Sequence, residues 1–182
     1  KFNLELKQRL DFVSVFGGPH PTYFPEIANE KGVDYIIRGE AEEVIGILLN
    51  KPKEKVVFGN LPQNLDNIPF PDREIIYEHL LKEKRNPIRH FIVSRGCPFS
   101  CPYCYNSAAR QLYLGQKWVR FRSPENVAEE IEQVLKKYGG KFVYFQDDCF
   151  DLNKEWLKKF LLVYKNKIGL PFHCMTRLDL LD

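Results

Sequence analysis

The stretch His90-Phe-Ile-Val-Ser94-Arg95-Gly96 runs directly into Cys97-Pro-Phe-Ser-Cys101-Pro-Tyr-Cys104. The short apolar run predicts a buried strand, so the three cysteines follow on the loop at its end. Cysteine thiolates are the usual ligands of iron–sulfur clusters. A four-iron cluster takes four ligands and this loop offers three, which would leave one iron open. An open coordination position distinguishes a reactive metal site from a closed structural one.

A structural zinc site is the alternative for these cysteines, because His90 or Cys149 could complete the ligand set. Structural zinc sites usually combine two separated pairs of ligands. The chain has no second cysteine pair, so the spacing favours the iron–sulfur cluster.

The pattern after the cysteines predicts parallel βαβ units. A helix begins at Ser123-Pro124-Glu125, with a capping serine and a proline in its first turn, and ends at Gly139-Gly140. A strand, 142–145, ends at Asp147-Asp148. A second helix begins near Asn153, and a last strand is predicted over 172–176.

The N-terminal part predicts the end of an open α/β sheet. Strands are predicted over 11–16 and 35–37, which end at Gly17-Gly18-Pro19 and at Arg38-Gly39-Glu40. A helix over 41–49 would place Val44, Ile45, Leu48 and Leu49 on one face. Prolines then concentrate at 52, 62, 69 and 71, which favours a connector between two units, with a long surface loop as the alternative.

Composition narrows the class of protein. A length of 182 residues with 44% hydrophobic content suits one domain or parts of two. The net charge of +3 comes without a dense basic tract, so no nucleic-acid partner is expected. We find neither a signal peptide nor an apolar run long enough to span a membrane, which predicts a cytoplasmic protein without a transmembrane segment. The chain begins at Lys1 and its one methionine is Met175, so we interpret it as an internal piece of a longer protein.

The cysteine spacing, the preceding Ser94-Arg95-Gly96 and the following Tyr105-Asn106 resemble the radical S-adenosylmethionine superfamily. The resemblance implies that Cys97, Cys101 and Cys104 bind a [4Fe–4S] cluster and that S-adenosylmethionine chelates the open iron. One electron from the cluster would then cleave the cofactor to a 5′-deoxyadenosyl radical. The resemblance also implies a small-molecule substrate and an electron donor such as flavodoxin or ferredoxin.

The same resemblance suggests residues that contact S-adenosylmethionine. Tyr103 would lie near the adenine, and Asp147 or Asp148 would hold the methionine amino group where the family more often has Gly-Gly-Glu. The alternative for these aspartates is that they cap the following helix. Arg177 could pair with a cofactor carboxylate or form a surface salt bridge. Cys149 and Cys174 lie outside the motif, and we interpret them as buried apolar residues.

The first fifty residues resemble the second half of a cobalamin-binding domain, as found in one branch of these enzymes. The resemblance rests on Gly17-Gly18-Pro19 and Gly39-Glu40, where glycines would allow close approach of the nucleotide tail. The alternative is a flavodoxin-like domain that binds no cofactor.

These observations predict an α/β protein in three parts. Residues 1–50 would form the C-terminal part of a flavodoxin- or Rossmann-like cobalamin-binding domain, 51–87 a connector, and 88–182 the first half of a partial (β/α)6 TIM-like barrel. The expected function is radical cleavage of S-adenosylmethionine coupled to cobalamin-dependent methyl transfer or rearrangement at an unactivated centre. The alternatives are a cobalamin-independent radical enzyme and a non-catalytic module that binds a structural metal.

Overall fold

The computed structural model describes residues 2–180, and its contacts divide the chain into two compact units. The first unit comprises the residues up to Gln63 together with Cys101–Gln116. The second comprises Asn64–Ser100 and the residues from Lys117 onward. Within the described residues, no helix is both long enough and apolar enough to cross a membrane.

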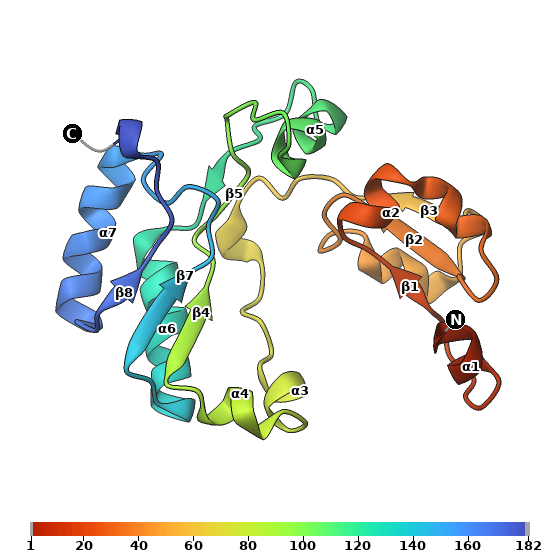
Figure 1. Ribbon diagram of the computed structural model, residues 1–182, viewed down its shortest axis with the longest axis horizontal. Coiled ribbons are helices and arrows are strands. Elements are labelled where there is room, and N and C mark those ends of the chain that lie inside the picture. Colours follow the sequence, from red (N-terminus) through yellow and green to blue (C-terminus); the bar gives the residue numbers. More distant parts are fainter. Residues whose placement is uncertain (1, 181–182) are drawn as a thin grey trace. The chain divides into compact units, whose positions relative to one another are not determined.

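The first unit contains a three-stranded parallel sheet in the order β1-β2-β3. Its elements are α1 (Phe2–Lys7), β1 (Val15–Phe16), α2 (Pro19–Tyr23), η1 (Pro25–Asn29), β2 (Tyr35–Arg38), η2 (Ile45–Asn50), β3 (Val56–Phe58) and α5 (Tyr105–Leu112) (Figure 1). The predicted strand over 35–37 is confirmed by β2, whereas the pattern over 11–16 forms only the two-residue strand β1.

The predicted helix over 41–49 is wrong. The segment forms a turn followed by the short 3-10 helix η2. Val44 and Leu48 are buried, but Ile45 is 55% exposed and Leu49 is 86% exposed. A glycine at 46 weakens an α-helix, and the tighter 3-10 turn does not keep these four residues on one face.

Strand β3 lies inside the predicted connector, yet it belongs to the first sheet. Its Val56 and Val57 are in parallel register with Ile36 and Ile37 of β2. Apolar β-branched residues suit a strand that is packed beside another. The first unit therefore extends past residue 50, and only the later part of the connector belongs to the second unit.

The second unit contains a parallel sheet in the order β4-β7-β8 and a two-stranded antiparallel sheet, β5-β6. Its elements are η3 (Leu65–Asn67), α3 (Glu74–Tyr77), α4 (Leu81–Arg85), β4 (Ile88–Phe91), β5 (Ser94–Arg95), β6 (Arg120–Phe121), α6 (Pro124–Tyr138), β7 (Phe142–Phe145), α7 (Lys154–Lys167), β8 (Phe172–His173) and η4 (Leu178–Leu180). The predicted parallel βαβ arrangement is confirmed, although the strand over 90–94 divides between β4 and β5, and β8 is shorter than predicted.

Both long helices begin where the sequence signals them, and α6 also ends at its predicted glycine. The Ser123 hydroxyl accepts a hydrogen bond from the backbone N–H of Asn126 at 3.2 Å, and α6 ends at Gly139. The Asn153 side chain caps α7 by accepting from the N–H of Trp156 at 3.0 Å. The apolar faces of α6 and α7 pack against the β4-β7-β8 sheet around Phe145 and form the core of this unit (Figure 1).

Candidate functional site

The loop that carries Cys97 is fixed by its neighbours in the second unit. Ser94 and Arg95 pair with β6, and the Trp118 indole donates a hydrogen bond to the carbonyl oxygen of Cys97 at 3.1 Å. Gly96 has φ +83°, and a Cβ atom there would lie 2.4 Å from the Trp118 carbonyl oxygen. Only glycine allows this turn and this close approach. The first cysteine is therefore presented on a defined backbone.

Cys101 and Cys104 lie on a turn that leads into α5, in the first unit. The N–H of Cys104 donates to the carbonyl oxygen of Cys101 at 3.0 Å, and Cys104 is the N-cap of the helix. The side-chain amide of Asn106 donates to Sγ of Cys104 at 3.9 Å. A donor to a ligating sulfur orients it and tunes its electron density. Tyr103, between the two cysteines, is 90% exposed.

The chemistry of these donors fits an iron–sulfur cluster. All five cysteines carry thiols, and the three of the motif are half-buried. Among the described residues, no three His, Cys, Asp or Glu side chains stand close enough together to hold a metal ion. Cys97 belongs to one unit and Cys101 and Cys104 to the other. Their assignment as joint ligands therefore rests on spacing and donor chemistry and stays a prediction.

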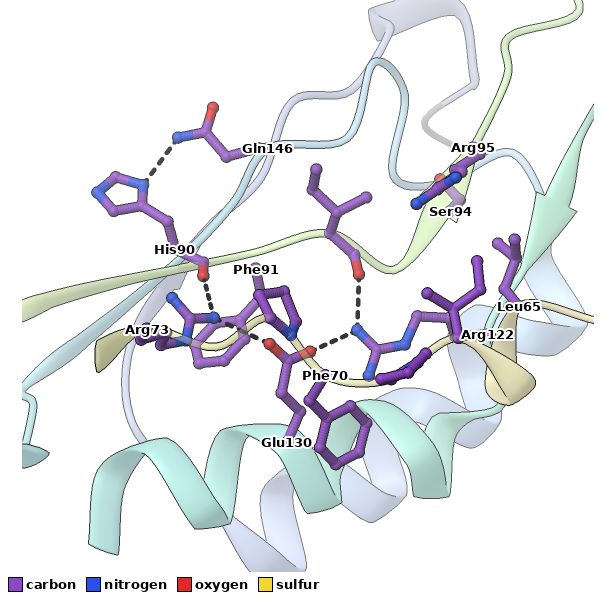
Figure 2. Close-up of a pocket in the computed structure, with 14 residues that line it drawn as sticks. Leu65, Phe70, Arg73, His90, Phe91, Ser94, Arg95, Arg122, Glu130 and Gln146 are labelled. Atoms are coloured by element: carbon purple, nitrogen blue, oxygen red, sulfur yellow. Dashed lines mark hydrogen bonds and ion pairs between the residues drawn. The ribbon is translucent and has the colours of Figure 1, made fainter. Parts of the chain in front are cut away.

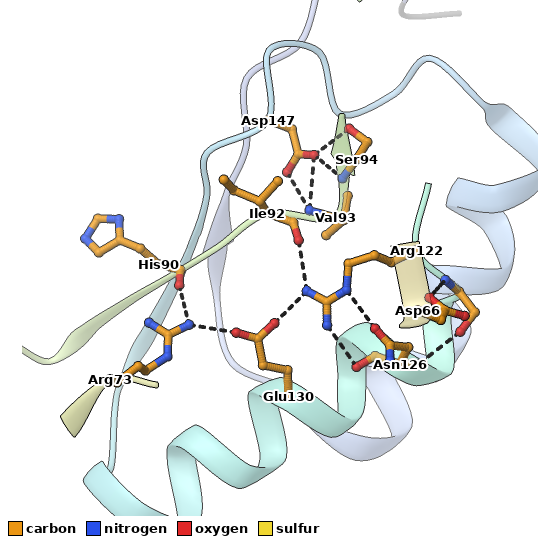
Figure 3. Close-up of polar contacts among 11 residues, drawn as sticks. Asp66, Arg73, His90, Ile92, Val93, Ser94, Arg122, Asn126, Glu130 and Asp147 are labelled. Carbon is orange, nitrogen blue, oxygen red and sulfur yellow. Dashed lines mark hydrogen bonds and ion pairs between the residues drawn. The ribbon is translucent and has the colours of Figure 1, made fainter. Parts of the chain in front are cut away.

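Asp147 lies at the end of β7, where it holds the end of β4 (Figure 3). Its carboxylate accepts hydrogen bonds from the backbone N–H groups of Val93 and Ser94 and from the Ser94 hydroxyl. The side chain is buried, and this burial raises the pKa of Asp147, although the hydrogen bonds from Ser94 and Val93 act in the opposite direction. The structure thus gives Asp147 a role in placing the strand that precedes Cys97.

Asp148 and Arg177 lie near the surface. Asp148 is exposed, and the Arg177 guanidinium makes a two-pronged salt bridge to Asp179 at 2.9 and 2.8 Å. That guanidinium also stacks 3.8 Å from the centre of the Phe99 ring, on the cysteine loop. Because Asn153 caps α7, the alternative that the aspartates serve as its cap is wrong. Contact of these residues with S-adenosylmethionine stays a prediction.

Cys149 is buried, as the sequence suggested, whereas Cys174 is half-buried. The Cys149 thiol donates to Asp151 at 3.3 Å. Burial first, and this contact second, raise the pKa of Cys149 to about 12. Burial also raises the pKa of Cys174. Both thiols are therefore protonated at neutral pH, which is typical of inert structural cysteines.

A buried ionic group, which the sequence analysis did not identify, holds the outer edge of β4. Glu130 of α6 binds Arg73 at 2.9 Å and Arg122 at 2.5 Å. The two guanidinium groups in turn donate to the carbonyl oxygens of His90 and Ile92 (Figure 3). These three side chains, here called the edge clamp, join the connector, α6 and β4.

A cavity of about 270 Å³ lies beside the edge clamp (Figure 2). Its apolar wall comes mainly from 65–71, and Arg122 stacks 5.3 Å from the centre of the Phe70 ring. His90 and Gln146 form a further part of the lining, joined by a 2.7 Å contact between Gln146 Nε2 and His90 Nδ1.

In the first unit, the structure brings the two predicted glycine segments together. The Thr22 hydroxyl donates to the carbonyl oxygen of Gly18 at 2.7 Å and accepts from the N–H of Gly39 at 3.0 Å. Gly17 and Gly18 precede α2, which begins at Pro19, and a Cβ atom on either glycine would have no heavy atom within 4 Å. This open space at the strand ends agrees with close approach of a ligand. Cobalamin binding there stays a prediction.

Gly39 and Glu40 contact Tyr113, which the sequence analysis did not identify, and their contact with cobalamin stays a prediction. The Tyr113 hydroxyl accepts a hydrogen bond from the N–H of Glu40 at 3.2 Å and donates to the carbonyl oxygen of Gly59 at 2.9 Å. Neither Tyr113 nor Gly59 has a local sequence signal that marks it as part of this edge. The contact joins the segment of Cys101 and Cys104 to the ends of β2 and β3.

Residues 91–182 match the family model described as the Radical SAM superfamily. An uncharacterized methyltransferase of Pyrococcus horikoshii is 35% identical over 78% of this chain and 34% of its own length. The anaerobic magnesium-protoporphyrin IX monomethyl ester cyclase of Rubrivivax gelatinosus is 30% identical over 92% of this chain and 34% of its own length. The bacteriochlorophyllide d C-8(2)-methyltransferase of Chlorobaculum tepidum is 26% identical over 92% of this chain and 39% of its own length.

The chain thus spans about a third of the length of the curated relatives it matches. No solved structure matches it.

Proposed function

Because the chain belongs to the radical S-adenosylmethionine superfamily, we propose that Cys97, Cys101 and Cys104 together hold a [4Fe–4S] cluster with one iron open. The observation that supports this most is the spacing of the three thiols in the sequence, together with the position of Cys97 directly after β4 and β5, at the carboxyl end of a parallel strand. Reactive groups of β/α barrels gather at this end of the strands. When bound and reduced, the cluster supplies one electron that cleaves S-adenosylmethionine to methionine and the 5′-deoxyadenosyl radical.

Several residues restrain the proposed ligands and the strand that precedes them. Trp118 and Gly96 fix the backbone of Cys97, Asp147 holds the preceding strand end, and Asn106 donates to the Cys104 sulfur. Each of these contacts limits how far a ligand can move, which lowers the cost of holding a cluster in one geometry. Tyr103, Arg177 and one of the two aspartates, Asp147 or Asp148, are proposed to contact S-adenosylmethionine itself.

We further propose methyl transfer or rearrangement of a small molecule, with cobalamin bound at the first sheet. The names of the relatives, methyltransferases and a cyclase, support the reaction class. The open space at Gly17 and Gly18 supports a ligand at the strand ends. The electron would come from a protein donor of the flavodoxin or ferredoxin class, which implies a cytoplasmic setting.

The test is anaerobic reconstitution of the full-length protein with iron and sulfide, followed by electron paramagnetic resonance of the reduced sample. We expect a four-iron signal that changes when S-adenosylmethionine is added. Replacing Cys97, Cys101 or Cys104 by alanine should remove the signal, whereas the matched variants C149A and C174A should keep it. Zinc alone in the motif, or a signal that ignores S-adenosylmethionine, would contradict the proposal in favour of a non-catalytic metal module.

Cobalamin requires its own measurement. The full-length protein, incubated with hydroxocobalamin and desalted, should retain the visible bands of the cofactor. Loss of these bands on desalting would contradict cobalamin binding. If the cluster signal still responded to S-adenosylmethionine, the result would support a cobalamin-independent radical enzyme.

A further inference from the structure

Tyr113 is buried at the end of the segment that carries Cys101 and Cys104. Only 3% of its surface is exposed. Its hydroxyl accepts from the N–H of Glu40 and donates to the carbonyl oxygen of Gly59, and its ring centre lies 5.3 Å from that of Phe58. The hydroxyl thus uses its donor and accepts one bond at this sheet edge.

The pocket for this hydroxyl exists because two residues lack side chains. A Cβ atom on Gly39 would lie 1.6 Å from the Tyr113 oxygen, and one on Gly59 would lie 1.6 Å from the carbonyl oxygen of Glu40. Real atoms do not approach so closely, so any larger residue at either position would displace the tyrosine or the backbone. Gly39 also has φ +80°, a conformation that side chains disfavour. We call Gly39, Gly59 and the backbone of Glu40 the glycine notch.

A second contact holds the other end of α5. The Tyr23 hydroxyl donates to the carbonyl oxygen of Tyr105 at 3.2 Å, and the two rings meet edge to face at 5.5 Å. Tyr23 directly follows Thr22, which binds Gly18 and Gly39. The helix after Cys104 is therefore attached at its start to α2 and, just past its end, to the residues that follow β2 and β3.

We propose that Tyr113 is a positioning residue that anchors the Cys101–Gln116 segment in the glycine notch, so that the geometry of two cluster ligands depends on this sheet edge. The coupling to the cluster rests on the proposed function, whereas the anchor itself does not. The glycine at 39 thus serves a contact inside the chain.

Hydrogen exchange of the full-length apoprotein, resolved by mass spectrometry, tests the anchor. Y113F removes both hydroxyl bonds but keeps the ring, and G39A fills the notch. Both should speed exchange of the α5 amides about tenfold, the size expected when one or two hydrogen bonds are lost. Exchange in α6 and β7 should stay unchanged, which shows that the second unit remains folded.

G115A is the matched control. Gly115 has φ +83°, nearly that of Gly39, but a Cβ atom there would have no heavy atom within 4 Å. It imposes similar backbone strain without a collision, so its α5 exchange should equal that of the wild type. If G39A and Y113F exchange like the wild type, or if G115A exchanges as fast as G39A, the anchor is overturned. Should G39A fail to fold, Y113F alone decides the question.

Electron paramagnetic resonance of the reconstituted protein tests the coupling. We expect Y113F to change the line shape of the reduced cluster with S-adenosylmethionine and G115A to leave it unchanged. Fast α5 exchange in Y113F with a wild-type spectrum would overturn the coupling. A wild type without any response to S-adenosylmethionine would instead be a failure of the proposed function, and the exchange result would still stand.

Discussion

Ser94 donates two hydrogen bonds to the same carboxylate oxygen of Asp147, from its backbone N–H at 2.6 Å and from its hydroxyl at 2.5 Å. The two residues follow β4 and β7, which are paired in the parallel sheet. A buried carboxylate thus replaces the backbone ladder where β4 ends (Figure 3). Together with the pairing of Ser94 and Arg95 with β6, this side chain positions the strand that leads to the cysteines.

Replacing Asp147 by asparagine should therefore destabilise the second unit. The amide keeps the shape but offers one acceptor oxygen, and its NH₂ group would face backbone donors. We expect a loss of about 1–3 kcal/mol in the free energy of unfolding, measured by urea denaturation of the apoprotein. The neighbouring D148N, at an exposed position, should change this free energy by less than about 0.5 kcal/mol. Equal effects of the two variants would contradict the assignment.

The same carboxylate should make stability depend on pH. Burial raises the pKa of Asp147 above its ordinary 3.8. A carboxyl group with a raised folded-state pKa contributes stability that is present at low pH and is lost as the pH rises through that pKa. The difference in unfolding free energy between wild type and D147N should therefore shrink as the pH rises from about 4. A difference that grows with pH would show that the pKa is lowered instead.

Cys149 should resist alkylation in the folded apoprotein. Its pKa of about 12, against an ordinary 9.0, lowers the reactive thiolate fraction at pH 8 about a thousandfold. Iodoacetamide labelling followed by mass spectrometry should detect modification of the half-buried Cys101 and Cys104 well before that of Cys149. In urea the three residues should react alike. Rapid labelling of Cys149 under native conditions would show that its burial is transient.

Glu130 should contribute far more to stability than the other acidic residues of α6. E130Q would leave Arg73 and Arg122 without their carboxylate, and breaking a buried pair typically costs about 3–5 kcal/mol. Glu132 lies on the same helix but forms only a 3.5 Å exposed pair with Lys167, so E132Q should cost less than about 1 kcal/mol. Urea denaturation of both variants checks the contrast, and similar midpoints would show that the edge clamp is dispensable.

Arg89 is a further buried charge whose loss should destabilise the second unit. Its guanidinium donates to the carbonyl oxygens of Tyr138 and Gly139, at the end of α6, and to those of Glu83 and Lys84 in α4. R89M keeps the aliphatic stem and removes these bonds together with the 3.4 Å bond to the Tyr77 hydroxyl, so we expect a loss of about 2–4 kcal/mol. The matched variant R85M, at an exposed position of α4, should be nearly neutral in the same denaturation experiment.

Elements with complete local signals could be predicted from the sequence. The helix α6 has a capping serine, a proline in its first turn and a terminal glycine, and the structure begins and ends it there. The segment over 41–49 has apolar spacing but no cap, and it contains Gly46, so tertiary contacts decided its shape. Strand β3 was not predicted within the connector, because a strand of three residues is too short to show the alternation of apolar and polar side chains.

The candidate site likewise has one part that could be predicted from the sequence and other parts that could not. The cysteine motif is local in the sequence, so its spacing alone identifies it. The Tyr113 anchor joins residues 54 and 73 positions apart, and the edge clamp joins Arg73 to Glu130 across 57 positions. Such pairs depend on the packing of whole elements, and a single sequence carries no signal that connects them.

The edge clamp also covers the β4 edge of the β4-β7-β8 sheet. The carbonyl oxygens of His90 and Ile92 are the groups with which a neighbouring strand would pair, and the guanidinium groups of Arg73 and Arg122 already bind them. An incoming strand, from this chain or from another molecule, would have to displace a buried ion group to join at β4. The β4 edge is therefore protected against pairing with a further strand.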